Sequence, residues 1–227
     1  MLYIMTGWRQ PFTSYPLLHV SQIGGQHPAS LAASWRCTAP VNWRGSGGAP
    51  HQGKHGMYHI EQLTTAQATQ HLPGLVYLLQ DAVHSGASLG FLPPLSEDVA
   101  YAYWRGVLTG MAQQTHRLLG AVVHNRLAGV VQLELATKPN AWHRAEVQKL
   151  CVLTTHRHQG IGRALMTAVE DLGRALGRTL LILDTRQGDS AERLYATLGW
   201  IRAGSIPQFA RSADGSLDST VIFYKLI

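Results

Sequence analysis

Residues 146–162 read EVQKLCVLTTHRHQGIG, and the predicted fold is built outward from this stretch. Its first half is rich in β-forming residues, a polar link follows, and the stretch ends in Gly160-Ile161-Gly162. Apolar residues then recur three and four positions apart from 161 to 176, which predicts a helix. The first amides of a helix lack intrahelical partners and attract an anion, and glycines let a phosphate approach the backbone. The stretch therefore predicts a strand, an anion-binding turn and a helix.

Two well-known phosphate-binding motifs do not fit this turn. A P-loop requires G-x-x-x-x-G-K-[ST], and the chain has no Gly-Lys pair of that kind. A dinucleotide-binding fingerprint requires a third glycine, and Leu165 stands at its position. The pattern that does fit is [Q/R]-x-x-G-x-[G/A], which matches residues 157–162, RHQGIG.

That pattern resembles the coenzyme A pyrophosphate loop of the GNAT superfamily of N-acetyltransferases. Downstream, 179–184 (TLLILD) reads as a buried strand and 190–198 as a short helix. Residues 195–200, YATLGW, resemble the Y-x-x-x-G-F signature of the superfamily. The order and spacing of these segments agree with the superfamily over residues 57–227.

Within the superfamily the chain is most similar to the tabtoxin resistance protein branch. The similarity lies in HSGASLGF (84–91), KPN (138–140), RAEVQKL (144–150) and LDT (183–185). The resemblance implies an α/β fold with a mixed central sheet of six to seven strands and about four flanking helices. It also implies a V-shaped splay at the central strands.

The length and composition of the chain indicate one globular domain and an additional segment. The chain has 227 residues, 45% of them hydrophobic and 14% charged. Residues 1–56 contain four basic residues and no acid, so the net charge of +6 leaves only 15 − 13 = +2 for residues 57–227. We interpret 1–56 as a leader outside the functional chain and 57–227 as the N-acetyltransferase domain.

The same composition argues against several partners and locations. No nucleic-acid-binding motif and no apolar run of membrane-spanning length is present. The two cysteines, Cys37 and Cys151, form no disulfide framework, so a cytoplasmic location is expected, and Cys151 is expected to be a small core residue. The histidines are scattered, so no metal site is expected. Edge strands could build a homodimer.

Apolar spacing predicts a helix over 65–84 that Pro73 complicates, and a second helix from the cap Ser96 to about 113. A hairpin is predicted from 117–124 and 127–136, then strands from 201 to about 205 and from 219 to 227. In the superfamily the first two helices and their loop wall the acceptor pocket. Resemblance therefore makes the following residues candidate substrate contacts, with core packing or capping of the sheet as the alternative: Asp81, Phe91, Tyr101, Trp104 and Trp142.

Resemblance also implies how acetyl-CoA would bind. Its pantetheine would lie beside Leu150–Leu153 like an added strand, and the N–H of Val152 would polarise the thioester carbonyl. The diphosphate would meet the first amides of the helix, with added charge from two arginines. The implied cofactor-binding residues are Leu150, Cys151, Val152, Arg157, His158, Gln159, Gly160, Ile161, Gly162, Arg163 and Ser190, although His158 and Ser190 depart from the residues common in the family.

Three residues are candidates for the chemistry. Tyr195 would protonate the departing thiolate, because a phenol with a pKa of about 10 stays protonated at neutral pH. Glu146 and Asp184 are candidates for the base or for binding the acceptor ammonium. Glu146 precedes Val152 by six residues and would share its face in an unbroken strand. A salt bridge to Arg144 or Arg186 is the structural alternative for either carboxylate.

The sequence therefore predicts direct transfer of an acetyl group from acetyl-CoA to a small cationic amine. Resemblance to the tabtoxin resistance branch suggests a β-lactam dipeptide toxin or an aminoglycoside such as kasugamycin, and hence antibiotic resistance. Acetylation of proteins or peptides, and a non-catalytic acetyl-CoA-binding module, remain as alternatives.

Overall fold

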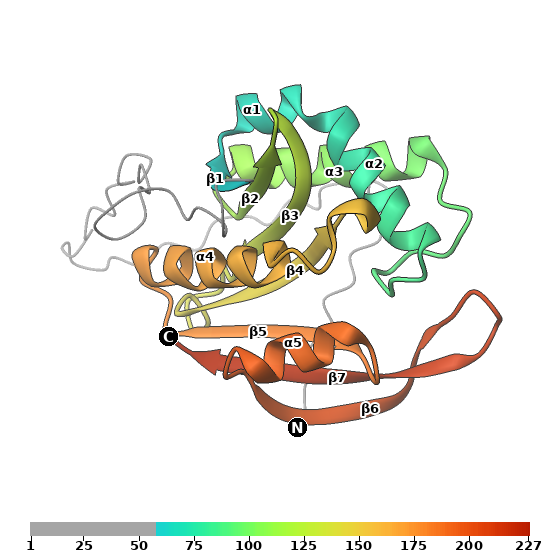
Figure 1. Ribbon diagram of the computed structural model, residues 1–227. Helices are drawn as coiled ribbons and strands as arrows, with labels where there is room; N and C mark the ends of the chain where they lie inside the picture. Colours follow the sequence, from blue (N-terminus) through green and yellow to red (C-terminus); the bar gives the residue numbers. More distant parts are fainter. Residues whose placement is uncertain (1–57) are drawn as a thin grey trace, which may run out of the picture. The chain divides into compact units, whose positions relative to one another are not determined.

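A seven-stranded mixed sheet runs through residues 58–227, the part of the chain that the computed structural model describes (Figure 1). The predicted leader, 1–56, lies outside the described residues. The strands in chain order are β1 (His59–Leu63), β2 (His116–Val123), β3 (Arg126–Leu135), β4 (Arg144–Val152), β5 (Leu180–Arg186), β6 (Ile201–Arg211) and β7 (Leu217–Leu226). Their order in the sheet is β1-β2-β3-β4-β5-β7-β6, and only β4 and β5 are parallel. The predicted α/β fold with six to seven strands is confirmed.

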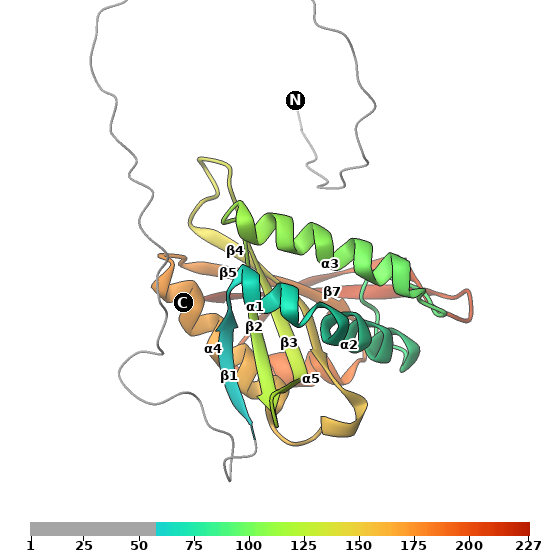
Figure 2. The ribbon, with the colours of Figure 1, turned by 90° about the horizontal axis from the view of Figure 1, so that it is seen from above.

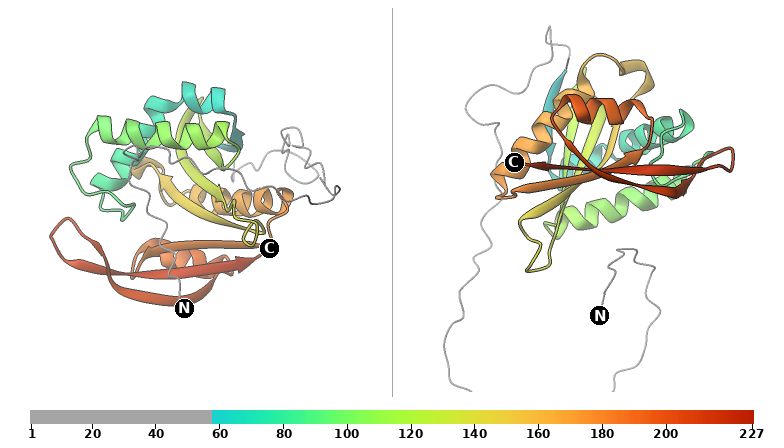
Figure 3. Two further views of the ribbon diagram at one scale, coloured as in Figure 1. Left: turned by 180° about the vertical axis from the view of Figure 1, so that it is seen from behind. Right: turned by 90° about the horizontal axis from the view of Figure 1, so that it is seen from below.

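Helices cover both faces of this sheet (Figures 2 and 3). One face carries α1 (Thr65–Gln70), α2 (Leu72–His84) and α3 (Glu97–Ala112), and the other carries α4 (Ile161–Ala175) and α5 (Ser190–Thr197). We call these the α3 face and the α4 face. The described residues thus contain five α-helices rather than about four, because 65–84 forms two.

The break between α1 and α2 has a local cause. Thr64 and Gln67 form a reciprocal capping box that starts α1, and Pro73 stands in the first turn of α2. Proline suits the first turn of a helix, where a missing N–H leaves no bond unmade, but it would remove one from the middle of a longer helix. The predicted cap of the next helix is confirmed, since the Oγ of Ser96 accepts a 3.4 Å hydrogen bond from the N–H of Val99.

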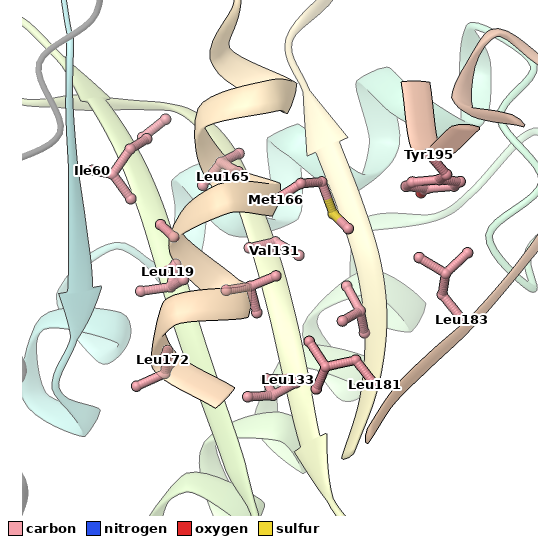
Figure 4. Packing of buried hydrophobic residues seen from close by; sticks show 14 of the residues in the cluster. Ile60, Leu119, Val131, Leu133, Leu165, Met166, Leu172, Leu181, Leu183 and Tyr195 are labelled. Carbon is pink, nitrogen blue, oxygen red and sulfur yellow. The ribbon is translucent and has the colours of Figure 1, made fainter. Parts of the chain in front are cut away.

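The sheet separates two hydrophobic cores. On the α4 face, residues such as Leu119, Val131 and Leu133 pack against Leu165 and Leu172 of α4 (Figure 4). On the α3 face, the core is formed by the sheet with α1, α2 and α3. Both cores consist of apolar residues that recur at helical spacing in the helices and at alternate positions in the strands. Burial of their apolar area therefore drives the assembly of the three layers.

Trp104 belongs to the core on the α3 face. Its side chain is 0% exposed, and its ring packs edge-on against Tyr103 at 5.1 Å between centroids. A side chain that is fully enclosed by protein cannot touch an acceptor, so the prediction that Trp104 contacts the substrate is wrong. The alternative, core packing, is what the structure shows.

One extra residue interrupts the pairing of β3 with β4. Val130 lies opposite Cys151, whereas Gln132 lies opposite Gln148, so three steps along β4 match two along β3. Lys149 takes up the difference with a φ of +50°. This is a β-bulge, which bends a strand and increases its local twist.

β4 also parts from β5 along its length. The two strands pair only from Arg144 to Glu146, and the rest of β4 runs without a partner on that side (Figure 1). The bulge at Lys149 lies in the part that diverges. The predicted splay of the central strands is confirmed.

The bulge changes which side chains of β4 share a face. Ala145 and Val147 lie in the core of the α4 face, and Leu150 and Val152 pack against that same core. Glu146 alternates with the first pair and therefore lies on the α3 face. The prediction that Glu146 and Val152 share a face is wrong, because one inserted residue shifts the alternation by one.

The last two strands are longer than predicted. β6 continues to Arg211 instead of ending near Ser205, with irregular register against β7 between Ile206 and Ala210. Pro207 falls in that irregular section of an edge strand, where a missing N–H leaves no ladder bond unmade.

Among the helices of residues 58–227, none has the length and apolar composition needed to cross a membrane.

Replacing Trp104 by alanine is expected to lower the free energy of unfolding by about 3–5 kcal/mol, because it empties a large buried volume. Val99→Ala, at a 48% exposed position of the same helix, should change it by less than about 0.5 kcal/mol. Urea unfolding followed by circular dichroism measures both. A Trp104→Ala protein that is as stable as wild type would contradict the core assignment.

Candidate active site

The N-terminus of α4 has the features of an anion-binding site. Its N-cap is Gly160, in a left-handed conformation with φ of +85°, and no side chain caps the helix. The amides of Ile161, Gly162 and Arg163 are the first of the helix and have no intrahelical acceptor. With the helix dipole behind them they suit a diphosphate, which is the group that the sequence predicted here.

The neighbours of this helix start come from two other elements. A Cβ added to Gly162 would lie 3.5 Å from Leu194 Cδ2 of α5 and 3.9 Å from Val152 Cγ2 of β4. His158, where the superfamily commonly has glycine, has a φ of +61°, so its backbone adopts a glycine-like conformation with an exposed side chain. Gln159 is exposed beside it. The backbone at His158 therefore adopts a conformation that glycine, the common residue of the motif, also favours.

Both predicted phosphate arginines have protein partners. The Nε of Arg157 donates to the carbonyl of Val152 at 3.3 Å, and its Nη2 donates to the Oγ of Ser85 at 2.6 Å. The Nη2 of Arg163 donates to Thr197 Oγ1 at 3.2 Å. Both arginines flank the helix start, and their contribution to phosphate binding stays a prediction.

The backbone of β4 has a free edge on the side where β5 has diverged. The N–H of Leu153 donates to the carbonyl of Ala128 at 2.9 Å and so points toward β3. Because successive peptide groups of a strand point to opposite sides, the N–H of Val152 points away from β3. Cys151 faces β3 in the same alternation, so its backbone is engaged, whereas the N–H of Val152 is available and its carbonyl accepts the bond from Arg157.

Cys151 is a core residue, as expected. Its side chain is buried in the core of the α3 face, and burial raises the pKa of its thiol to about 12. A thiol that stays neutral at physiological pH is a poor nucleophile. Cys151 can therefore contribute to cofactor binding only as part of β4 and not as a nucleophile.

Tyr195 projects from α5 toward the end of β4. Its ring packs 6.2 Å from Trp200 and 5.9 Å from Phe223 between centroids, and it lies above Leu183 beside β4 (Figure 4). Burial raises the pKa of its hydroxyl above the usual value for a phenol, and the nearby Cys151 adds to the shift. Among residues 58–227 this hydroxyl makes no hydrogen bond, so it remains protonated and free to donate.

A chain of hydrogen bonds, which we call the polar ladder, crosses the α3 face. The hydroxyl of Tyr103 donates to Gln132 Oε1 at 2.8 Å, and Gln132 Nε2 donates to Gln148 Oε1 at 2.9 Å. Gln148 Nε2 then donates to Glu146 Oε1 at 2.7 Å and to Glu134 Oε2 at 3.0 Å. Gln132 is 1% exposed, so the ladder satisfies polar groups that would otherwise be costly to bury.

Sequence reasoning missed most of the polar ladder. A signal was available: Gln132 and Glu134 alternate with apolar residues in the predicted strand LAGVVQLEL, as Glu146 and Gln148 do in β4. Polar residues at alternate positions of a buried strand indicate a shared polar face. Which helix residue completes that face, here Tyr103, follows only from the packing.

Glu146 and Asp184 lie on the same face of the sheet near one another. Burial raises the pKa of Glu146, and the charges of Glu134 and Asp184 raise it further, while the bond from Gln148 and the charge of Lys149 lower it. Asp184 is exposed and accepts a 3.0 Å hydrogen bond from Thr220 Oγ1. β5 continues for two residues beyond Asp184, which therefore lies near its end and not at it.

Neither carboxylate forms the salt bridge that the sequence left open. In the part of the chain that the structure describes, Arg186 pairs instead with Asp189, at 2.8 Å, and with Asp218, at 3.5 Å. Glu146 and Asp184 therefore remain without a cationic partner in direct contact. Carboxylates arranged in this way can receive an ammonium group.

The other predicted substrate contacts have different surroundings. The two carboxylate oxygens of Asp81 accept 2.8 Å bonds from the N–H and the hydroxyl of Thr154, which ties α2 to the 3-10 helix Thr154–His156. Phe91 packs edge-on against Tyr103 at 5.5 Å and is half-buried beside the polar ladder. Ser190 is exposed as the first residue of α5.

Trp142 lies far from the predicted thioester position. It is 59% exposed, next to the guanidinium of Arg178, and it precedes the first residue of β4. Val152 ends the same strand, which at about 3.3 Å per residue puts roughly 25 Å between the two ends. The prediction that Trp142 stacks on the acceptor is therefore wrong. Asp81 ties two elements together, and its contact with the acceptor stays a prediction.

The segment after α2 connects the two diverging strands. Ser85 accepts from Arg157, which follows β4, and the carbonyl of Gly86 accepts a 3.0 Å bond from Nη2 of Arg186, at the end of β5. Two adjacent residues thus contact both sides of the splay.

Within residues 58–227, no three His, Cys, Asp or Glu side chains are grouped to hold a metal ion.

Comparison with known proteins gives one consistent family. The model of the acetyltransferase (GNAT) family matches residues 80–200. A protein of Azospirillum brasilense, described as an uncharacterized N-acetyltransferase in the hisH-hisA intergenic region, is 29% identical over 146 residues, which cover 63% of this chain and 84% of its own length.

Solved structures agree in fold. The ribosomal-protein-alanine N-acetyltransferase of Brucella melitensis is similar with a TM-score of 0.61 and 20% identity, covering 74% of this chain and 99% of its own. The protein yncA of Salmonella typhimurium, solved with its cofactor acetyl-CoA, has a TM-score of 0.60 and 16% identity, covering 74% and 93%. At such identities these structures show a shared fold and nothing finer.

Replacing Glu146 by glutamine is expected to stabilise the protein at pH 8 and to have little effect at pH 4. A raised pKa in the folded state means that ionisation of Glu146 disfavours folding, so this penalty is absent below the ordinary carboxyl pKa and appears as pH rises through the raised value. The amide oxygen can still accept the bond from Gln148. Urea unfolding across this pH range measures the difference.

Glu97→Gln, in the exposed first turn of α3, is the control. An acid favours a helix N-terminus, so this change should lower stability slightly instead of raising it. A gain for Glu146→Gln that is the same at every pH would contradict burial of its charge as the cause.

Proposed function

Because the chain belongs to the acetyltransferase (GNAT) family, we propose that it transfers the acetyl group of acetyl-CoA directly to the amine of a small acceptor held beside β4. N-acetyl transfer and the use of acetyl-CoA follow from the family. The acceptor, its position and the roles of individual residues are the content of the proposal. Its central observation is that β4 leaves β5 after Glu146 and so has a free backbone edge between two helix-covered faces.

The residues present fit the cofactor. The free amides at the start of α4 suit its diphosphate, and the free edge of β4 at Val152 suits the amide groups of its pantetheine arm. Bound acetyl-CoA supplies an acyl group activated as a thioester. The N–H of Val152 is proposed to donate to the thioester carbonyl, where negative charge develops during attack by the amine.

Tyr195 is proposed to donate its proton toward the departing thiolate. Its hydroxyl has no other partner among residues 58–227, and its raised pKa keeps it protonated throughout the physiological range. A phenol of high pKa is a weak acid, so hydrogen-bond donation to the developing thiolate is the larger part of the role. Stabilising charge that appears only in the transition state raises turnover more than it raises binding.

The carboxylates on the opposite side are proposed to receive the acceptor. Glu134, Glu146 and Asp184 face one lysine, Lys149, so the acceptor side carries more negative than positive charge. An ammonium group is attracted to such a site and is deprotonated there by a carboxylate whose pKa is raised. Glu146, held by Gln148, is the better-oriented base, and Asp184 is the binder.

We further propose that the acceptor is a small toxin or antibiotic and that acetylation confers resistance. Support comes from the charge of the acceptor side and from the similarity to the tabtoxin resistance branch. Ser85 and Gly86 bond to arginines on both sides of the splay, and we take this bridge to favour a small acceptor over a folded protein.

A thiol-release assay with acetyl-CoA tests this proposal across dipeptides, amino acids, aminoglycosides, polyamines and peptides that begin with the sequences of ribosomal proteins. Acetylation of one small-molecule class supports the proposal. Preference for peptides would replace it by the protein-acetylating alternative. Acetyl-CoA binding with no transfer to any amine would favour a non-catalytic module.

Tyr195→Phe is expected to lower kcat roughly 10²- to 10³-fold, the usual effect of losing one hydrogen-bond donor to charge that develops in the transition state, with the KM for acetyl-CoA almost unchanged. Steady-state kinetics at saturating acceptor measures it. Tyr77→Phe, at a 61% exposed position of α2, is the matched control and should keep wild-type rates. Unchanged turnover in Tyr195→Phe would remove Tyr195 from the mechanism.

Glu146→Gln and Asp184→Asn are expected to separate the base from the binder. Loss of the base lowers kcat roughly 10²-fold or more at saturating acceptor, whereas loss of the binder raises the acceptor KM with little change in kcat. We expect the first result for Glu146 and the second for Asp184. Wild-type values of both constants in both variants would exclude a carboxylate base on this face.

A further inference from the structure

Lys149 occupies a position that a lysine seldom holds. It takes up the bulge of β4 with φ of +50°, in the left-handed region that glycine and asparagine adopt most readily. The bulge could be made by glycine with less strain. A lysine at this position therefore suggests that its side chain has a functional role.

The ammonium of Lys149 lies against two aromatic rings on the α3 face. Its Nζ is 5.1 Å from the ring centroid of Tyr103 and 5.9 Å from that of Phe91. Cation–π attraction holds the charge there but uses none of its three N–H donors. Throughout residues 58–227, no hydrogen bond or ion pair engages this ammonium.

The carboxylates of the site surround Lys149 without pairing with it. Glu134 on β3, Glu146 on β4 and Asp184 on β5 all act on it electrostatically, and burial lowers its pKa against their influence. The polar ladder holds Glu134 and Glu146 through Gln148. The acceptor side thus has an anionic part and a separate cation whose donors are unused.

We infer that Lys149 binds a carboxylate of the acceptor, so that the acceptor is an amino acid or a short peptide with both a free amine and a free carboxylate. The inference rests on the proposed function, because it concerns the acceptor of that same site. The amine of such a molecule faces Glu146 and Asp184 while its carboxylate receives the N–H donors of Lys149. Both charges of the acceptor and both charges of the protein are then matched.

The same arrangement disfavours a polycation. An aminoglycoside carries several ammonium groups and no carboxylate, so it would bring like charge against Lys149 and leave the lysine donors unsatisfied. Of the two acceptor classes that the sequence left open, the dipeptide type therefore fits Lys149. Lys149 acts as a specificity-determining residue, and it takes no part in the bond changes.

Matched acceptor pairs test the inference with the full-length protein. Amino acids and dipeptides are compared with their C-terminal amides, which keep the amine and lose the carboxylate, by thiol release from acetyl-CoA. Wild type is expected to have a kcat/KM at least tenfold higher for the acids. Equal rates within pairs, or faster reaction of the amides, would overturn the inference without any variant.

Lys149→Met removes the charge and keeps a side chain that can pack against the two rings. It is expected to reduce the acid-to-amide ratio of kcat/KM toward one, and Lys149→Arg is expected to retain most of the ratio. Arg105→Met is the matched control: Arg105 also lies over a ring, Tyr101, at 5.7 Å on α3, and its loss should leave the ratio unchanged. Isothermal titration with acetyl-CoA verifies that each variant is folded. If Lys149→Met leaves the acid-to-amide ratio of kcat/KM unchanged, Lys149 does not bind the carboxylate of the acceptor.

Outcomes for the inference and for the proposed function are distinct. Turnover of aminoglycosides or polyamines without turnover of any carboxylate-bearing acceptor rejects the role of Lys149 and keeps the acetyl transfer to small amines. Binding of acetyl-CoA with no reaction of any amine rejects both.

Discussion

A single inserted residue in β4 is the constraint on which the rest of the site depends. β3 holds β4 in register on both sides of Lys149, so the extra residue must be absorbed by a bend and a twist. It lies where β4 has already parted from β5, and in this stretch the peptide group of Val152 has no partner strand. The insertion also divides the side chains of β4, with Glu146 and Lys149 on one face and Leu150 and Val152 on the other.

This division separates two kinds of chemistry across one strand. The α4 face provides the uncapped helix start and the protonated hydroxyl of Tyr195, which suit a polyanionic thioester and its leaving group. The α3 face provides the polar ladder and the separated charges around Lys149, which suit an amine-bearing acceptor. The two reactants of an acyl transfer would therefore approach β4 from different sides, and a strand with a free edge brings them together.

Burial disfavours the charged forms of two groups on the α3 face, Glu146 and Lys149. Gln132 and Gln148 are satisfied by the ladder, but burial still raises the pKa of Glu146 and lowers that of Lys149. Groups with perturbed pKa values in one cluster are characteristic of sites that carry out proton transfer. Ser85 and Gly86 hold the two diverging strands through Arg157 and Arg186, which limits how far the splay can open.

The sequence alone determined the order of elements, the helix start at Gly160 and the family, because hydrophobic periodicity and a glycine-bearing motif are local signals. It did not determine which side chains meet. Trp104 entered the core, Trp142 lies at the far end of β4, and Asp81 became a tether to Thr154. One bulge moved Glu146 to the opposite face from Val152, and the ladder from Tyr103 to Glu146 joins α3, β3 and β4. Those contacts span up to 73 positions of the chain, and only the packing of helices on a bent strand sets the distances between them.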